Sequence, residues 1–270
     1  RKVKGKDFMR AVQVVVVSDD DLKNQTRLSE SADVRVAWGG EAAVTAIGAL
    51  PKKWWCEDVV YGPKYSYGLV DKTSLVSYQR IAARLAFDVA TFDQYACSSP
   101  HTVFVEESAE VSAADFAREL ARQLELVTDK FLPKDEVDTA TKLNILTARA
   151  KGAMTGQVMA SKNTDWTVVL STEPGLAQAC FSRVITVKPI KNLGELASLN
   201  SRKTQTLGLA AAEVGRGELV DKLTVRGVDR VVPFGTMTLF DTPWDGMFAL
   251  DRMVRWVTCY NGEPYGAASS

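Results

Sequence analysis

Short valine-rich runs alternate with longer segments of helical periodicity along most of the chain, and this alternation constrains the fold more than any other feature. Residues 33–38 (DVRVAW) are typical of a buried strand, and residues 39–50 (GGEAAVTAIGAL) place alanine and isoleucine at helical spacing up to Pro51. A helix between two strands brings the chain back to the end of the sheet at which the first strand began, so that the two strands run parallel. The sequence therefore predicts an α/β fold with one or two largely parallel sheets.

Further elements follow from the same two patterns. Strands are expected at 11–17, 57–62, 65–70, 101–106, 165–171, 183–188 and 228–233. Helices are expected at 72–93, from Ser112 onward, and at 135–152, 193–199, 217–225 and 246–258. Residues 11–17 follow several basic residues, as the apolar part of a signal peptide would. Acidic residues rather than a small-residue cleavage site come after them, which favours a strand.

The composition is that of a globular protein and excludes several classes of function. The 270 residues are 46% hydrophobic and 24% charged. Lys plus Arg and Asp plus Glu number 33 each and are well mixed, so we expect no nucleic-acid partner. No apolar run approaches the roughly 18–20 residues of a membrane span. Four scattered cysteines and a single histidine predict neither a metal site nor disulfides, and favour a reducing cytoplasm.

A pair of glycines joins the strand at 33–38 to the following helix. Free backbone N–H groups at a helix N-terminus bind phosphate well when no Cβ atom crowds them. The same pair would also suit a tight strand–helix turn that needs glycine for its φ values. Trp38, Gly39 and Gly40 are therefore candidates for a phosphate-binding turn, with the plain turn as the alternative. Glu41 suits the helix dipole but would repel a phosphate placed close to it.

A cysteine, Cys97, lies in the segment ACSSP (96–100), between a helical segment and a strand-like run. Pro100 disfavours helix at the residue before it, so the backbone becomes irregular near the cysteine. Such a backbone exposes N–H groups around Ser98 and Ser99 that would stabilise a thiolate or an oxyanion. A free cysteine is otherwise most often a small buried apolar residue. The pattern leaves both a nucleophile and a packing role open.

Five motifs, taken in order, resemble one family. They are AWGGEAAV, VVYGPKYSYGLV, ACSSP, KTQTLGLAA and GVDRVVPFGTMTLFDTPWDGMFALDRMVRWV. The chain resembles the long-chain acyl-CoA and acyl-protein thioester reductases, the reductase component of the bacterial luminescence fatty-acid reductase complex. That family belongs to the aldehyde dehydrogenase superfamily, and the resemblance covers essentially the whole chain.

The resemblance implies an aldehyde-dehydrogenase-like fold, in which part of a doubly wound cofactor sheet precedes a second α/β catalytic domain. The expected division is 1–70 for the later part of the dinucleotide-binding domain, 71–240 for the catalytic domain, and 241–270 for a C-terminal helix and tail.

The resemblance also assigns roles to the candidate residues. It implies that Cys97 accepts the acyl group and that the turn at 38–40 contacts the pyrophosphate of the cofactor. Tyr61 and Gly62 are then expected near the nicotinamide through backbone contacts, and the backbone at Ser98 and Ser99 supports the thiolate or oxyanion. No residue is expected to bind a metal.

Two departures from the family pattern bear on the reaction. Oxidising members of the superfamily carry a glutamate in an E-L-G-G motif, which activates water. Residues 60–63 (VYGP) stand in that place, which favours thioester reduction over aldehyde oxidation. Family members are also longer, so the chain is expected to begin partway through the cofactor domain, without the asparagine that the superfamily uses as an oxyanion donor. Losing such a donor costs about 3–4 kcal/mol of transition-state stabilisation.

The resulting expectation is NADPH-dependent reduction of fatty acyl thioesters, carried on CoA or on a protein, to aldehydes, with NADH as the alternative cofactor. The expected partners are the thioester substrate, an acyl-protein synthetase subunit and further copies of the chain. Two other functions stay open, namely a CoA-acylating aldehyde dehydrogenase for short chains and a non-catalytic fragment or assembly subunit.

Overall fold

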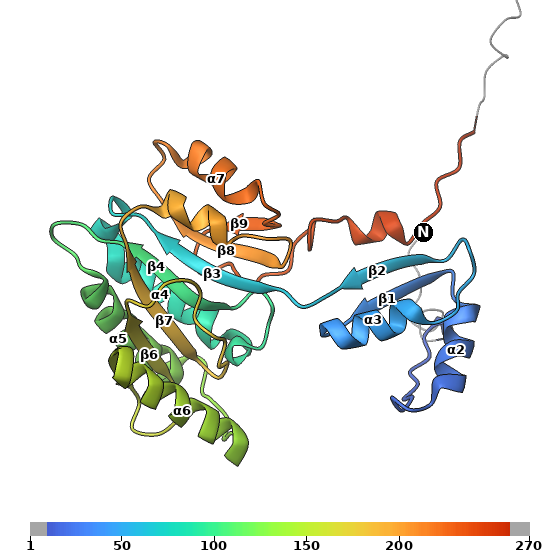
Figure 1. Ribbon diagram of the computed structural model, residues 1–270, viewed down its shortest axis with the longest axis horizontal. Helices are drawn as coiled ribbons and strands as arrows, with labels where there is room; N and C mark the ends of the chain where they lie inside the picture. The colour runs from blue at the N-terminus through green and yellow to red at the C-terminus, as the bar shows by residue number, and fades with distance from the viewer. Residues whose placement is uncertain (1–9, 260–270) are drawn as a thin grey trace, which may run out of the picture. The chain divides into compact units, whose positions relative to one another are not determined.

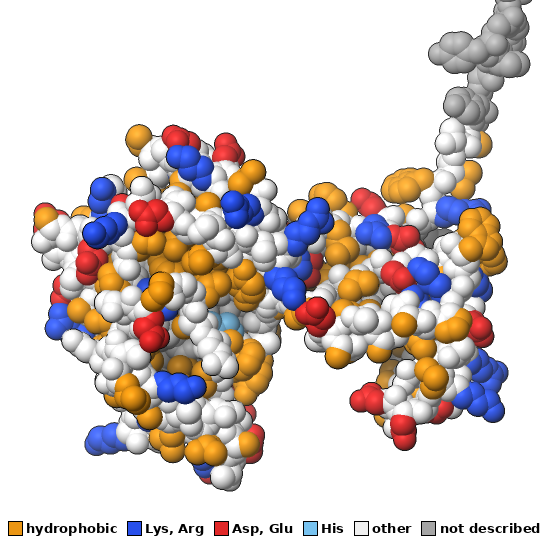
Figure 2. All heavy atoms as spheres, viewed as in Figure 1, with side chains coloured by type: hydrophobic (Ala, Val, Ile, Leu, Met, Phe, Trp, Pro, Cys, Tyr) orange, Lys and Arg blue, Asp and Glu red, His pale blue; other side chains and the backbone are white. Residues whose placement is uncertain are grey.

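The computed structural model describes residues 10–259, which form two compact units (Figure 1). The smaller unit ends at Gly62 and takes up the chain again from Ala249, and the larger unit spans Pro63–Phe248. Lys and Arg side chains are interspersed with Asp and Glu side chains on the visible face (Figure 2). No helix within the described residues is long and apolar enough to cross a membrane.

The smaller unit is built on two parallel strands that pair from Val34 opposite Glu57 to Trp38 opposite Tyr61. Its elements are α2 (Leu22–Ser31), β1 (Val34–Trp38), α3 (Glu41–Ala49), β2 (Glu57–Tyr61) and the 3-10 turn η4 (Ala249–Arg252).

A buried arginine holds the smaller unit together. Arg35 on β1 is only 7% exposed, and its Nε and Nη2 donate to the two carboxylate oxygens of Asp58 on β2 at 2.6 and 2.8 Å. Its Nη1 donates to Ser29 Oγ and to the carbonyl oxygens of Ile47 and Leu50 at 2.7–3.1 Å. One guanidinium therefore ties the two strands to the ends of both helices. Its hydrogen bonds lower the pKa of Asp58 to about 2.

We expect Asp58→Asn to loosen the smaller unit, because it leaves Arg35 buried without its carboxylate. A hydrogen bond to a charged group contributes about 1.5–3 kcal/mol. The native pKa of about 2 lies below the ordinary value of about 3.9, so the contribution is complete above pH 4 and is lost as the pH falls through about 2. Hydrogen exchange at pH 7 should show reduced protection in β1 and β2 only. Full protection there in the variant would contradict the prediction.

The larger unit is a seven-stranded sheet in the order β5-β6-β7-β4-β3-β8-β9 (Figure 1). All neighbouring strands run parallel except β5 and β6, which are antiparallel. The strands are β3 (Tyr65–Val70), β4 (Pro100–Glu106), β5 (Gly156–Ala160), β6 (Thr167–Ser171), β7 (Val184–Ile190), β8 (Thr204–Ala210) and β9 (Arg230–Val232).

Two apolar layers cover the two faces of this sheet. The α-helices are α4 (Tyr78–Ala90), α5 (Ala113–Lys130), α6 (Thr139–Thr155) and α7 (Arg216–Thr224), and the 3-10 turns are η1 (Ser74–Ser77), η2 (Thr91–Gln94) and η3 (Leu193–Leu199). On one face Val103 and Val105 of β4 pack against α4 and α5. On the other face Phe104 packs in a cluster that includes Tyr67 of β3 and residues of η3 and α7. Successive strand residues face opposite sides, so β4 contributes to both layers.

The α/β class with a largely parallel sheet, predicted from the sequence, is confirmed. The boundary between the compact units falls at Gly62, whereas the sequence placed it at residue 70. Residues 65–70 form β3, which pairs with both β4 and β8, so this strand belongs to the larger sheet.

The strand predicted at 11–17 is wrong. Residues 12–17 form neither helix nor strand, and Val14 and Val16 are 89% and 96% exposed. A valine-rich run becomes a strand only where a neighbour accepts its backbone hydrogen bonds. No sequence pattern predicted α2, β5 or β8.

The helix predicted at 246–258 is also wrong. Trp244 and Met247 exchange two backbone hydrogen bonds of 3.0 Å, and the residues between them, Asp245 and Gly246, have φ values of 50° and 72°. This left-handed turn closes a loop, and up to residue 259 only the short η4 follows it. The apolar spacing of the segment was therefore not a helix signal. The last residues of the expected tail, 260–270, lie outside the described residues.

Candidate functional site

The thiol of Cys97 lies between η2 and β4, at the amino ends of the central strands. The register places Ser66 of β3 opposite Pro100 of β4. Ser66 Oγ donates to the carbonyl oxygen of Cys97 at 2.7 Å and accepts from the backbone N–H of Thr206 on β8 at 3.1 Å. One hydroxyl therefore fixes the cysteine loop to two neighbouring strands. The side chain of Cys97 is partly accessible.

A side-chain amide contacts the sulfur directly. Gln205, which is fully buried at the start of β8, places its Nε2 3.1 Å from Cys97 Sγ and 2.5 Å from Asp245 Oδ1. Asp245 comes from the loop after β9. Neither residue was predicted from the sequence as part of the site. Gln205 lies within the motif KTQTLGLAA, but no spacing rule connects a position in that strand with a cysteine 108 residues away.

Burial raises the pKa of the Cys97 thiol, and the charge of Asp245 adds to the rise. The Gln205 amide and the backbone N–H groups of Cys97 and Ser98 lower it part of the way. The sequence predicts that backbone N–H groups or the bound cofactor lower this pKa. In the chain alone the N–H groups act in the expected direction but do not outweigh burial, and a contribution of the cofactor stays a prediction. The backbone N–H of Ser99 donates to the carbonyl oxygen of Ala96 at 2.9 Å, so it does not act on the sulfur.

Buried polar atoms without a hydrogen-bond partner gather around this cysteine. Among the described residues these atoms are Gln94 Oε1, Ser99 Oγ, His101 Nδ1, Gln205 Oε1 and Trp244 Nε1. Gln94, Ser99 and His101 lie within four residues of Cys97 in the sequence, Gln205 contacts its sulfur, and Trp244 precedes Asp245. Buried polar atoms normally have a partner, so these are positions at which a bound water or ligand would complete the hydrogen bonding.

The single histidine sits beside this loop in an aromatic setting. The His101 ring meets Phe181 edge-on at 5.1 Å, and Phe181 stacks on Tyr95. Burial lowers the pKa of His101 to about 4, so the ring is neutral at pH 7. Its contacts are with rings rather than with the thiol, and we assign it no role in proton transfer.

The glycine turn lies in the smaller unit. Trp38 ends β1 and stacks on Tyr61 of β2 with the ring centroids 4.5 Å apart. Gly40 caps the start of α3, and a Cβ added there would meet no described atom within 4 Å. A Cβ at Gly39 would come within 3.2 Å of the Cβ of Ala43, so this glycine permits close packing of the turn on the helix. Gly62 directly follows β2, also with open space around its Cα.

The structure thus brings Ser98 and Ser99 together with Cys97, and brings Trp38, Gly39, Gly40, Tyr61 and Gly62 together with one another. The two groups lie in different compact units.

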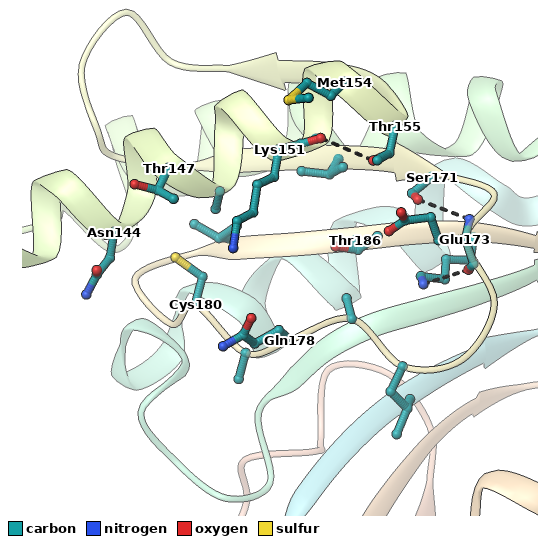
Figure 3. A pocket seen from close by; sticks show the side chains of 18 of the residues that line it. Asn144, Thr147, Lys151, Met154, Thr155, Ser171, Glu173, Gln178, Cys180 and Thr186 are labelled. Carbon is teal, nitrogen blue, oxygen red and sulfur yellow. Dashed lines mark hydrogen bonds between the residues drawn. The ribbon is translucent and has the colours of Figure 1, made fainter.

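A cavity of about 640 Å³ lies elsewhere in the larger unit, between α6, strands β6 and β7, and the loop before β7. Lys151 of α6 and Cys180 of that loop point into it (Figure 3). Lys188 on its floor is 4% exposed and donates to the carbonyl oxygen of Glu173 at 2.8 Å. Burial raises the pKa of Cys180. The described lining of this cavity does not include Cys97, and its buried lysine is already bonded, so it carries less chemistry than the Cys97 site.

The match to known families decides the identity of the chain. Residues 3–256 match the family described as acyl-CoA reductase (LuxC). The chain belongs to this family. It is 26% identical over 246 residues to the long-chain acyl-protein thioester reductase of Aliivibrio fischeri, covering 89% of this chain and 49% of that protein. It is 27% identical to long-chain acyl-protein thioester reductase 2 of Photobacterium leiognathi, covering 92% and 52%. The chain thus spans about half the length of these relatives.

Solved structures agree on the fold. An NAD-dependent aldehyde dehydrogenase from Burkholderia multivorans superposes with a TM-score of 0.56 at 13% identity, covering 85% of this chain and 45% of that one. A 1-pyrroline-5-carboxylate dehydrogenase from Thermus with bound NAD gives 0.54 at 14% identity, covering 76% and 44%. At these identities the likeness shows the fold alone.

The buried environment of Cys97 predicts a high pH for its alkylation. Because its pKa is raised, reaction with iodoacetamide should reach half its maximal rate above the pH of about 8.5 that is typical of a free cysteine. Mass spectrometry of the alkylated peptides measures this profile residue by residue. A rate that is already maximal at pH 7 would contradict the prediction.

Proposed function

We propose that the chain belongs to an enzyme that reduces fatty acyl thioesters to aldehydes, with Cys97 as the acyl-accepting nucleophile. The observation that carries the proposal is the placement of this thiol, partly accessible, pinned by Ser66 and contacted by the Gln205 amide. Membership of the acyl-CoA reductase family and the names of the relatives support the reaction class. Because the chain spans half of those relatives, the activity of the whole protein is part of the proposal.

The acyl transfer follows from the chemistry of the thiol. Cys97 Sγ loses its proton and attacks the carbonyl carbon of the thioester, and the bond from that carbon to the carrier sulfur breaks. The carrier leaves as a thiol after taking up a proton, and the acyl group stays on Cys97. Residues 60–63 carry no carboxylate, so this stretch supplies no base to activate water against the acyl-enzyme.

A nicotinamide cofactor fits the glycine turn of the smaller unit. The open space at Gly40 and the N-terminus of α3 suit a pyrophosphate, and the Trp38–Tyr61 stack borders the turn. When bound in reduced form, the cofactor would supply the hydride that converts the acyl group into the aldehyde. Release of the aldehyde would leave the Cys97 thiolate, which takes up a proton to restore the thiol. We propose NADPH, with NADH as the alternative. Gly62 follows β2 and would border the nicotinamide side through its backbone.

The proposed substrates are fatty acyl groups on CoA or on a protein, and an acyl-protein synthetase subunit is the proposed donor of the latter. The four cysteines, which all lie within the described residues, are free thiols and suit a reducing compartment such as the cytoplasm.

Cys97→Ser in the full-length protein tests the nucleophile. We expect parental protein to gain the mass of one acyl group on Cys97 after incubation with long-chain acyl-CoA, and the variant to gain none. The serine hydroxyl keeps the size of the side chain but is too weak an acid to attack without a base. NADPH affinity should remain unchanged. An acylated serine variant, or a parental protein acylated only elsewhere, would contradict the proposal, and a short-chain acyl-CoA in parallel tests the chain-length alternative.

Gly40→Val tests the cofactor turn. The position has an ordinary φ of −66° and open space, so the fold should tolerate the side chain, while the Cβ and methyl groups occupy the place proposed for the phosphate. We expect the Kd for NADPH to rise about tenfold, which corresponds to about 1.4 kcal/mol. Gly48→Val, in the last turn of the same helix and equally open, is the matched control and should bind as the parental protein does. Equal affinities in both variants would remove the turn from the cofactor site.

A further inference from the structure

The side-chain amide of Gln205 is held in one of its two orientations by Asp245. An amide presents a donor nitrogen on one side and an acceptor oxygen on the other. A carboxylate only accepts, so the atom 2.5 Å from Asp245 Oδ1 must be the nitrogen. The second hydrogen on that same nitrogen then faces Cys97 Sγ at 3.1 Å. A rotated amide would place its oxygen against the carboxylate and against the sulfur.

From this geometry we infer that Gln205 is a catalytic residue that donates a hydrogen bond to the sulfur of Cys97, and that Asp245 is the positioning residue that keeps the donor turned toward the sulfur. The inference rests on the proposed role of Cys97. An N–H group stabilises the sulfur when it is an anion, which occurs before attack on the thioester and again when the aldehyde leaves.

The loop that carries Asp245 is fixed on several sides. Trp244, next to it, lies under the guanidinium of Arg230 at 4.7 Å and is buried. Arg230 itself donates to Thr206 Oγ1 and to the carbonyl oxygens of Met237 and Leu239, at 3.1–3.2 Å. Asp245 therefore meets Gln205 in a prearranged position, and the amide gains its orientation without ordering a mobile segment.

The Gln205–Asp245 contact has two unfavourable consequences. No described protein group donates to the buried Gln205 Oε1, and the negative charge of Asp245 disfavours the thiolate. The charged groups that act on the sulfur are Asp245, which disfavours the thiolate, and Arg230, which favours it. The Gln205 amide hydrogen-bonds to both the Asp245 carboxylate and the Cys97 sulfur. The carboxylate, whose charge disfavours the thiolate, thereby orients an N–H group that stabilises it.

Alkylation of Cys97 in the full-length protein tests the contact itself. Gln205→Met keeps the length of the side chain and removes its donors, so the iodoacetamide profile of Cys97 should move to higher pH. Acylation by long-chain acyl-CoA at pH 7 should slow about 10- to 100-fold, as expected for one hydrogen bond to a charged group.

Gln205→Glu, which has the same shape and offers no N–H, should shift the alkylation profile in the same direction. It covers the case in which the methionine variant fails to fold. Gln123→Met is the matched control, because it removes another buried amide that donates to a carboxylate, that of Glu119 on α5, at 2.7 Å.

A double-variant cycle tests the positioning role of Asp245. In the parental background Asp245→Asn frees the amide to rotate, and acylation should slow several-fold. In the Gln205→Met background no amide remains to be positioned, so the same substitution removes only a repulsive charge, and acylation should be unchanged or faster. Equal slowing in both backgrounds would make Asp245 a merely structural residue. An unshifted alkylation profile in both Gln205 variants would overturn the inference. Absence of acyl transfer in the parental protein would instead contradict the proposed function, and the alkylation profiles would still show whether Gln205 acts on the thiol.

Discussion

A single serine hydroxyl joins the parts on which the candidate site depends. Ser66 on β3 donates to the carbonyl oxygen of Cys97 and accepts from the N–H of Thr206 on β8. The segments it joins are far apart in sequence, and only the parallel register of β4, β3 and β8 places them side by side. Because Gln205 is the neighbour of Thr206, the same register also sets the distance between the amide and the thiol. The chemistry at Cys97 therefore depends on the strand order as directly as on the residues themselves.

The two compact units are stabilised in different ways, and this suits the roles proposed for them. The larger unit buries apolar side chains on both faces of its sheet, which gives rigid ends on which a thiol and an amide can be placed within tenths of an ångström. Within residues 10–259 the smaller unit has only two strands, buries no residue of α3, and depends on the Arg35–Asp58 pair. A phosphate bound by backbone N–H groups needs a helix end and open space rather than a deep apolar core. Gly40 provides both.

Sequence patterns predicted those features that depend on local chemistry. Valine-rich runs and helical spacing predicted the α/β class, and Pro100 indicated the irregular backbone at Cys97, where residues 95–99 form neither helix nor strand. Patterns could not tell a strand from an unpaired run at 12–17, because pairing depends on a neighbour. Nor could they find Gln205 and Asp245, whose meeting with Cys97 requires the packing of three distant segments. A left-handed turn at Asp245 and Gly246 stands where a terminal helix was predicted, and this turn places the Asp245 carboxylate beside Gln205.

The raised pKa of the Cys97 thiol is compatible with a nucleophile that stays protonated until the substrate binds. Each unit of rise reduces the thiolate at neutral pH about tenfold, but the intrinsic nucleophilicity of the thiolate increases with its basicity, with a Brønsted coefficient of about 0.4–0.5. The net loss is therefore only about threefold to fourfold per unit. A thiol that is mostly protonated is also less open to oxidation, which proceeds through the thiolate. The Gln205 donor then supports the anion in the steps that form it, so the environment of Cys97 favours a protected resting thiol over one that is permanently ionised.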